Sequence, residues 1–258
     1  MIKYNYHTHT KRCGHANGED EEYVLRAIKD GYKVLGFSDH VMLPGISQPG
    51  IRGEFDEVEN YLNSINYLKE KYKDEITILR GFECEYFPKF ASYYKGFLDS
   101  KKVDYLILGQ HFYMDENDNL ISCTFRATDV EGSEKRYIEL LLKGMASGLF
   151  KYVAHPDLFC ILRKEWGEDY EKLTRRICEA AIEYDIPLEI NLCRTEYEDK
   201  EKWKYPREEF WQIASTYGVK VVIGVDAHDP AMLDKVAFDR AFELIERYKL
   251  NYIEKLDI

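Results

Sequence analysis

The sequence predicts an α/β fold, a distorted TIM-like (β/α)7 barrel that forms a single domain over residues 1–258. The length of 258 residues is ordinary for one α/β barrel. Short apolar runs rich in β-branched and aromatic residues alternate with segments of helical period, which is typical of parallel βα units. The seven histidines follow the apolar runs and avoid the helical segments.

Seven apolar runs are the predicted strands. In chain order they are Ile2–Tyr6, Val34–Ser38, Ile76–Phe82, Tyr105–Gly109, Tyr152–Ala154, Leu188–Asn191 and Val219–Val225.

Helices are predicted between these strands from apolar residues three or four positions apart, which form one face of a helix. The stripes are Phe55/Val58/Leu62/Ile65/Leu68, Val24/Ile28, Tyr137/Leu141, Leu173/Ile177/Ala181, Phe210/Ala214 and Phe238/Phe242/Ile245. No Gly, Pro or Ser-rich linker divides the chain, so one domain is expected.

Composition narrows the classes of function. A net charge of −11 argues against a nucleic-acid partner, because phosphate backbones attract positive surfaces. No run approaches the roughly 18 apolar residues of a membrane helix, so no membrane partner is expected. Six cysteines without a C-x-x-C pair, and no signal peptide at the start, predict reduced thiols and a cytoplasmic location.

Three longer stretches follow predicted strands, at 41–53, 112–128 and 191–205. In a βα barrel such stretches lie over the carboxyl ends of the strands, where lids and substrate loops belong.

Metal ligands are predicted from the positions of the histidines. His7 and His9 form an H-x-H pair whose side chains point the same way on an extended segment, so both can reach one cation. The other candidates also follow strands and converge on one rim of a parallel barrel. They are His15, His40, Glu83, His111, His155, Asp226 and His228.

Nine candidate ligands are too many for one ion, since catalytic zinc takes about three protein ligands and a water. Two or three metals fit the number better. A lone histidine or a DH dipeptide is weak evidence for a metal site. The set as a whole is stronger evidence, because imidazoles packed together without metal would be costly to desolvate and would repel one another when protonated.

As a set, H-x-H near the start, the later histidine at 15, SDH, G-x-E and G-x-D-A-H resemble the polymerase and histidinol phosphatase (PHP) superfamily. Within it, LEIN followed by Arg194 and by Tyr205-Pro206 resembles the histidinol-phosphate phosphatase branch.

The resemblance implies a seven-stranded barrel with three divalent metal ions, zinc first, with iron or manganese as alternatives. His7, His9, Glu83 and Asp226 would hold one ion. Glu83 would bridge to a second ion held by His111 and His155. The third would be held by His15, His40 and His228.

The implied reaction is the hydrolysis of L-histidinol phosphate, a step of histidine biosynthesis, by a metal-bridging hydroxide. Glu83, Asp226 and His228 are the expected catalytic residues. The sequence does not choose among Asp226, Asp157 and water as the proton donor to the leaving oxygen.

Substrate contacts are expected from the loops. Arg194, Arg163 and Arg126 are candidates for the phosphate, because guanidinium groups bind it bidentately. Glu85, Asp157, Phe112 and Tyr113 are candidates for the rest of a small phosphate ester. Asp39 and Asn191 are expected to orient the ligands.

Three alternatives remain open at this stage. Another PHP phosphoesterase could act on nucleotides or other small esters. An amidohydrolase barrel also opens with H-x-H, but it usually has eight strands and often a metal-bridging lysine where this chain has Gly109-Gln110-His111. A non-catalytic metal-binding module is the third. The oligomeric state is not predicted.

Overall fold

The computed structural model describes residues 3–124, 127–162, 165–193, 205–235 and 238–258. Within these ranges, four strands at the start of the chain pair side by side in sequence order, and every pair is parallel. They are β1 (Tyr4–Asn5), β2 (Val34–Phe37), β3 (Thr77–Cys84) and β4 (Tyr105–Leu108).

A segment around Val153 and two further strands extend this sheet. Val153 bridges β4 at Leu108 and β7 (Leu188–Asn191) at Leu188, and β7 pairs in parallel with β8 (Lys220–Gly224). A last parallel bridge between Thr8 and Ala227 joins the end of β8 to the end of β1. The described strands therefore close into a parallel barrel in which Val153 takes the place of the fifth strand, and the predicted fold class is confirmed.

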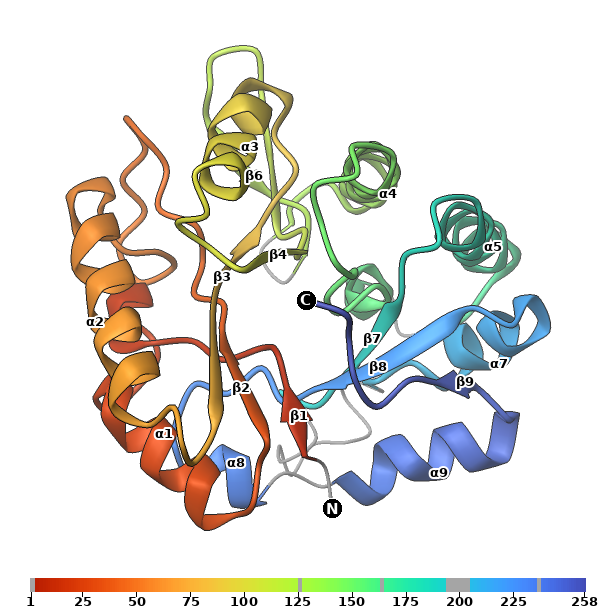
Figure 1. Cartoon of the computed structure of the whole chain (residues 1–258). Helices are drawn as coiled ribbons and strands as arrows, with labels where there is room; N and C mark the ends of the chain where they lie inside the picture. The colour runs from red at the N-terminus through yellow and green to blue at the C-terminus, as the bar shows by residue number, and fades with distance from the viewer. Residues whose placement is uncertain (1–2, 125–126, 163–164, 194–204, 236–237) are drawn as a thin grey trace.

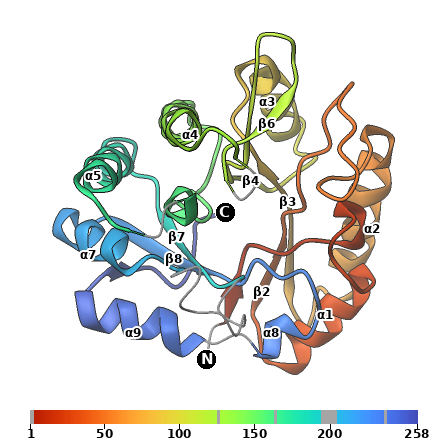
Figure 2. The ribbon, with the colours of Figure 1, turned by 180° about the vertical axis from the view of Figure 1, so that it is seen from behind.

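Helices surround the curved sheet on its outside (Figures 1 and 2). They are α1 (Asp20–Lys29), α2 (Val58–Lys71), α3 (Ala91–Asp99), α4 (Val130–Ala146), α5 (Glu168–Glu183), α7 (Glu208–Tyr217), the short α8 (Met232–Lys235) and α9 (Phe238–Tyr248). Short 3-10 turns lie at η1 (Lys11–Cys13), η2 (Phe55–Glu57), η3 (Pro88–Phe90) and η4 (Leu158–Leu162). No helix among these described residues has the length and apolar character needed to cross a membrane.

Two buried clusters follow from the alternation of side chains along the strands. On β4, Leu106 and Leu108 belong to the larger cluster under the helices, whereas Tyr105 and Ile107 belong to a smaller one. The smaller cluster fills the barrel and consists of Tyr6, Val34, Tyr105, Ile107, Tyr152, Ala154, Val222 and Leu256. The backbone N–H of Leu256 donates to the hydroxyl of Tyr6, so the C-terminal segment packs against this smaller cluster.

Several elements differ from the prediction. The fifth strand, predicted over Tyr152–Ala154, contracts to the single bridging residue Val153. Phe55 does not belong to the core stripe of α2, because it lies in η2 with 46% of its surface exposed. The strand β9 (Asn251–Tyr252), the helices α3 and α8, and the antiparallel hairpin of β5 (Phe112–Met114) and β6 (Leu120–Ser122) were not predicted.

Candidate metal centre

The nine predicted ligands meet at the carboxyl ends of the barrel strands, although they come from segments far apart in the chain. His7 and His9 follow β1, His40 follows β2, Glu83 lies near the end of β3, and His111 follows β4. His155 follows Val153, while Asp226 and His228 follow β8. A cavity of about 480 Å³ opens over the candidate ligands, and eight of them line it: His9, His15, His40, Glu83, His111, His155, Asp226 and His228.

Glu83 lies at the centre of the group. Its Oε1 is 2.6 Å from Nε2 of His155 and 3.7 Å from Nε2 of His111. Its Oε2 is 3.0 Å from Nδ1 of His40, and 3.6 and 3.5 Å from Nε2 of His7 and His9. Because the two oxygens face different sets of imidazoles, this carboxylate has the geometry of a bridging ligand.

Asp226 faces the H-x-H pair from the end of the neighbouring strand, β8. Its Oδ1 lies 3.0 Å from Nε2 of His9 and 3.5 Å from Nε2 of His7. The two Nε2 atoms are themselves 3.2 Å apart. The alternation expected for an extended H-x-H segment is therefore observed, since both rings point to the same place.

A second group lies nearer the surface. His15, His40 and His228 present ring nitrogens that all lie within 4.8 Å of one another. Nε2 of His228 is 3.0 Å from Nε2 of His15, and the ring of His228 stacks on that of His9 with centroids 4.1 Å apart. The three histidines that the family resemblance assigns to a third ion therefore lie close together.

The donor set fits divalent cations of the zinc type, because imidazole and carboxylate are their common ligands. Nδ1 of His155 has no hydrogen-bond partner within the described residues, and Nδ1 of His40, Nδ1 of His111 and Oδ1 of Asp226 lie close to a neighbouring carboxylate or imidazole without forming a hydrogen bond to it. Ring nitrogens also face ring nitrogens in the His7–His9 and His15–His228 pairs. Buried polar atoms in this state are costly unless something else binds them.

Glu189 supports the site from the fully buried strand β7. Its Oε1 lies 2.9 Å from Nδ1 of His7, and its Oε2 accepts the backbone N–H of His155 at 3.0 Å. His155 and Asp226 are non-glycine residues with φ of 34° and 52°, conformations that need such support. Asn191 donates to both Glu189 Oε2 and Asp226 Oδ2, at 2.9 and 3.1 Å.

Glu189 was not among the predicted site residues. The signal that could have revealed it is a charged residue inside an otherwise apolar strand, which must find a partner when buried.

Asp39 holds the other side of the centre. Its Oδ1 is 3.4 Å from Nδ1 of His9 and accepts the backbone N–H of His40 at 2.9 Å. Its Oδ2 accepts the hydroxyl of Thr10. A carboxylate on the far nitrogen of an imidazole fixes the tautomer and the ring orientation.

Two glycines leave room for the buried carboxylates. A Cβ on Gly109 would lie 1.9 Å from Oε1 of Glu83, and one on Gly224 would lie 1.7 Å from Oε1 of Glu189. Neither glycine has a positive φ, so close approach alone explains these residues.

The pKa shifts of the histidines run in two directions. They are upward for the inner pair, His7 and His9, and downward for the outer group, His15, His40 and His228. Burial disfavours the charged form of His7, yet the carboxylates of Asp226 and Glu189 outweigh it and raise the pKa of His7. The pKa of His9 is likewise raised to about 9, where Asp226 and Asp39 outweigh burial. Burial also opposes ionisation of Glu83 and Asp226, but the imidazoles around them hold both pKa values well below the usual range.

The outer histidines behave in the opposite way. Burial lowers the pKa of His228 to about 3 and also lowers the pKa of His15 and of His40. These three rings are therefore neutral at physiological pH and can offer a lone pair to a cation.

Only some of the residues predicted to contact substrate lie in the described part of the chain. Arg126, Arg163 and Arg194 lie outside the described residues. Glu85 is buried against Arg52, with Nη2 of Arg52 3.0 Å from its Oε1, and the same oxygen is 3.5 Å from Nδ1 of His111. Its contacts favour the orientation of His111 over a contact with substrate.

Asp157 is fully buried directly before Leu158, which lines the cavity. Its Oδ2 accepts the backbone N–H of Arg207 at 2.6 Å, and Oδ1 has no described partner. Burial raises the pKa of Asp157 to about 7. Phe112 lines the cavity, whereas Tyr113, next to it on β5, is not among the lining residues.

Cys13 is a further donor that was not predicted. Its Sγ groups with ring nitrogens of His9 and His228, all within 4.8 Å of one another. Burial raises the pKa of this thiol to about 12, so it is protonated at neutral pH and is a poorer ligand than the imidazoles.

Comparison with known proteins agrees with this geometry. A probable histidinol-phosphatase of Deinococcus radiodurans is 24% identical over 229 residues, which cover 87% of this chain and 85% of that protein. A probable phosphatase of Caldicellulosiruptor bescii is 26% identical and covers 88% of this chain and 80% of its own length. The crystal structure of the Lactococcus lactis histidinol phosphate phosphatase, complexed with zinc, L-histidinol and phosphate, superposes with a TM-score of 0.74.

That superposition covers 100% of this chain and 99% of the Lactococcus chain at 19% identity, so the likeness is one of fold. The PHP domain model matches residues 5–192. The resemblance read from the histidine motifs is therefore confirmed. Since the match spans more than half of the sequence, the chain belongs to the PHP domain family.

Proposed function

We propose that the whole chain, residues 1–258, acts as one metal-dependent phosphomonoesterase that hydrolyses L-histidinol phosphate to L-histidinol and phosphate. The observation that carries this proposal is the convergence of seven histidines with Glu83 and Asp226 at one end of the barrel, where all of them except the buried His7 line one cavity of about 480 Å³. Relatives named histidinol-phosphatase, and a solved relative complexed with zinc, L-histidinol and phosphate, support the choice of substrate.

Three divalent ions, zinc first, are the proposed cofactor. His7, His9, Glu83 and Asp226 would hold one ion, and Glu83 would share a second with His111 and His155. His15, His40 and His228 would hold the third. When bound, such ions supply a strong nucleophile at neutral pH and neutralise charge on the phosphoryl oxygens.

Asp226, Glu83 and His228 are proposed as the catalytic residues because all three line the cavity that would receive the phosphate ester. Glu189, Asn191 and Asp39 would keep the ligands in their orientations through the hydrogen bonds described above. Glu85 would do the same for His111.

Tyr205 is an added candidate for substrate contact. It lines the cavity, and its buried hydroxyl has no hydrogen-bond partner in the described part of the chain. Burial raises the pKa of this hydroxyl well above its usual value, so it stays protonated and can donate to a phosphate or alcohol oxygen. Arg194, Arg163 and Arg126 remain the proposed phosphate contacts.

The cavity favours a small ester over a polymer. Its volume of about 480 Å³ is within the range of small-molecule sites, and its wall includes the apolar side chains of Ile51, Phe112, Leu158 and Met232. A net charge of −11 further disfavours a polynucleotide substrate.

The test is phosphate release by the purified, metal-loaded protein, combined with elemental analysis of the same sample. We expect two to three equivalents of divalent metal. We also expect a kcat/KM for L-histidinol phosphate at least about tenfold above that for a nucleoside monophosphate, a sugar phosphate or p-nitrophenyl phosphate.

Two results would contradict the proposal in different ways. Faster turnover of a nucleoside monophosphate would keep the phosphoesterase and reject the substrate. Full metal content without phosphate release from any ester would indicate a metal-binding module.

A further inference from the structure

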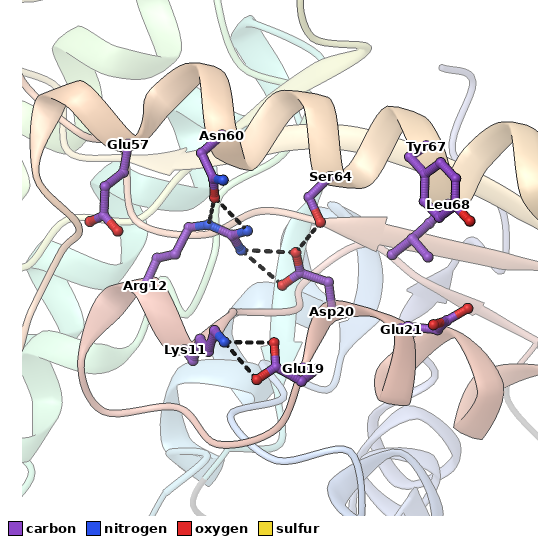
Figure 3. Close-up of a pocket in the computed structure, with 10 residues that line it drawn as sticks. All are labelled: Lys11, Arg12, Glu19, Asp20, Glu21, Glu57, Asn60, Ser64, Tyr67 and Leu68. Atoms are coloured by element: carbon purple, nitrogen blue, oxygen red, sulfur yellow. Dashed lines mark hydrogen bonds and ion pairs between the residues drawn. The ribbon is translucent and has the colours of Figure 1, made fainter.

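Arg12 lies on the outer side of the centre, in the turn η1 between the ligands His9 and His15. Its guanidinium group is held from two sides at a surface cleft between α1 and α2 (Figure 3). Nη1 donates to both carboxylate oxygens of Asp20 at 2.8 and 2.9 Å. Nε and Nη2 donate to Oδ1 of Asn60 at 3.1 and 2.9 Å, and Ser64 donates to Asp20 at 2.5 Å.

This arrangement fixes Arg12 more firmly than an ordinary surface ion pair. The side chains of Arg12 and Asp20 are only 9% and 7% exposed. One nitrogen, Nη1, contacts both oxygens of Asp20, and charge-assisted hydrogen bonds of this kind are strong when they are shielded from solvent. Nε and Nη2 bind Asn60, so all three nitrogens of the guanidinium are engaged and the group has little freedom to rotate.

The same guanidinium also reaches inward. Nη1 lies 3.3 Å from Oγ1 of Thr10, a fully buried residue, and the hydroxyl of Thr10 donates to Oδ2 of Asp39. The other oxygen of Asp39 faces Nδ1 of His9 at 3.4 Å. A continuous chain of polar contacts therefore runs from Asp20 at the surface to His9.

A second contact leads to the same carboxylate residue. The guanidinium carbon of Arg12 lies 5.7 Å from the ring centroid of Tyr61. The hydroxyl of Tyr61 accepts the backbone N–H of Asp39 at 3.4 Å and donates to the carbonyl of Gly81 at 2.9 Å. Arg12 thus touches both side chains that hold Asp39 from this side, Thr10 at its carboxylate and Tyr61 at its backbone.

We propose that Arg12 is a positioning residue of the metal centre: clamped by Asp20 and Asn60, it fixes Thr10 and Asp39 so that Asp39 holds His9 in its metal-binding orientation. The inference rests on the proposed metal site and extends it to the cleft between α1 and α2. It also gives Asp39, a carboxylate with no exposed surface, a nearby positive charge.

The test measures zinc binding, not turnover, with chelator-buffered zinc and elemental analysis. Arg12→Gln should weaken the binding of one zinc equivalent by about three- to tenfold, because more direct supporting contacts typically contribute ten- to a hundredfold. Arg12→Lys should weaken it as well, since a lysine cannot reproduce the fork. The matched control is Arg26→Gln, which removes the ion pair between Arg26, near the C-terminal end of α1, and Asp30.

A double-mutant cycle separates positioning from a general loss of packing. Thr10→Val removes the hydroxyl that links Arg12 to Asp39, whereas Thr10→Ser keeps it. If Arg12 acts through Thr10, the double variant R12Q/T10V should bind zinc about as weakly as T10V alone, and R12Q/T10S should behave like R12Q. Multiplying fold-changes in R12Q/T10V would overturn the proposal.

Two further outcomes are decisive. Unchanged zinc affinity in R12Q, with zinc bound by the unmodified protein, would overturn the inference and leave the proposed function standing. Absence of zinc binding in the unmodified protein would overturn both. If R12Q does not fold, Asp20→Asn releases the same clamp, and its thermal unfolding in chelator reports folding separately from zinc affinity.

Discussion

Oε1 of Glu83 and Nε2 of His155 lie 2.6 Å apart, although 72 residues separate them in the chain. The contact joins the end of β3 to the segment after Val153, on opposite sides of β4. With this contact, the carboxylate of Glu83 faces five imidazoles, more than any other carboxylate among the described residues. They are His7, His9, His40, His111 and His155.

Glu83→Gln tests this central position. The amide keeps the shape but loses the charge that two cations would share, so we expect loss of at least one metal equivalent. Phosphate release should fall by about a thousandfold, which corresponds to several kcal/mol of transition-state stabilisation. Elemental analysis and phosphate release are the measurements. Glu134→Gln is the control, because Glu134 is also buried but pairs with Tyr170 away from the centre.

Gly109→Ala tests whether space around Glu83 is limiting. The new Cβ would meet Oε1 of Glu83 at 1.9 Å, so the carboxylate must move and metal content should fall. Gly96→Ala is the matched control on α3, where nothing lies within 4 Å of the added methyl group. That control should stabilise the protein by about 0.5–1 kcal/mol, since alanine is the better helix former. Equal metal content in both variants would contradict the expectation.

The convergence of the candidate ligands could be predicted from the sequence because their positions obey a simple rule. In a parallel barrel every strand ends at the same rim, so His40, His111 and His155 meet whatever the loop lengths are. Asp39 was also predicted, since it stands beside a ligand. The supporting contacts of Thr10 and Arg12 depend on how η1 packs against α2. No pattern in the local sequence predicts that packing.

Other features carried weak or misleading signals. Helix α3 has a glycine at its centre and three aromatic residues, so its helix propensity is low and packing decides its structure. Phe55 continues the apolar spacing of α2 but falls in the preceding 3-10 turn, where it is about half exposed and does not join the core. Glu189 was not predicted as a site residue, because a single charged residue within a short apolar strand forms no periodic pattern that marks it.

Glu189→Gln tests the support given to His7. The carboxylate faces Nδ1 of His7 and accepts the backbone N–H of His155, and a glutamine cannot keep both contacts with the same charge. We expect metal affinity to fall by about ten- to a hundredfold. Chelator competition measures this. Glu179→Gln on α5, where the side chain is exposed, should leave the affinity unchanged. An unaltered affinity in E189Q would show that His7 needs no such partner.

Asp104→Asn tests an ion-pair network far from the centre. Asp104 accepts from the backbone and guanidinium of Arg80 and from Lys69. Burial opposes its ionisation, but Arg80 and Lys69 lower its pKa overall. Stabilisation by a carboxylate with a lowered pKa is complete above the unfolded pKa of about 3.9 and is lost as the pH falls through the folded pKa.

At pH 7 we therefore expect D104N to lower the free energy of unfolding by about 1–2 kcal/mol. The difference from the unmodified protein should shrink as the pH falls below about 4. Urea denaturation at both pH values measures it. Asp99→Asn, which removes an exposed pair with Lys95, should change stability little at either pH. A difference that persists at low pH would exclude an ionic origin.

Removal of metal should destabilise the protein, because the ligands occupy the ends of strands that close the barrel. Without a cation, the facing nitrogens of His15 and His228 and the buried Nδ1 of His155, which has no hydrogen-bond partner in the described part of the chain, must be accommodated within the fold. A metal ion present at 100 times its dissociation constant stabilises the folded protein by about 2.7 kcal/mol, which for a domain of this size corresponds to a Tm shift of about 5–10 °C.

We expect a chelator to lower Tm by this amount and zinc to restore it. Magnesium should not restore it, since it prefers oxygen ligands. Equal Tm values for the verified metal-free protein and the zinc-saturated protein would mean that the imidazoles gather for some reason other than cation binding.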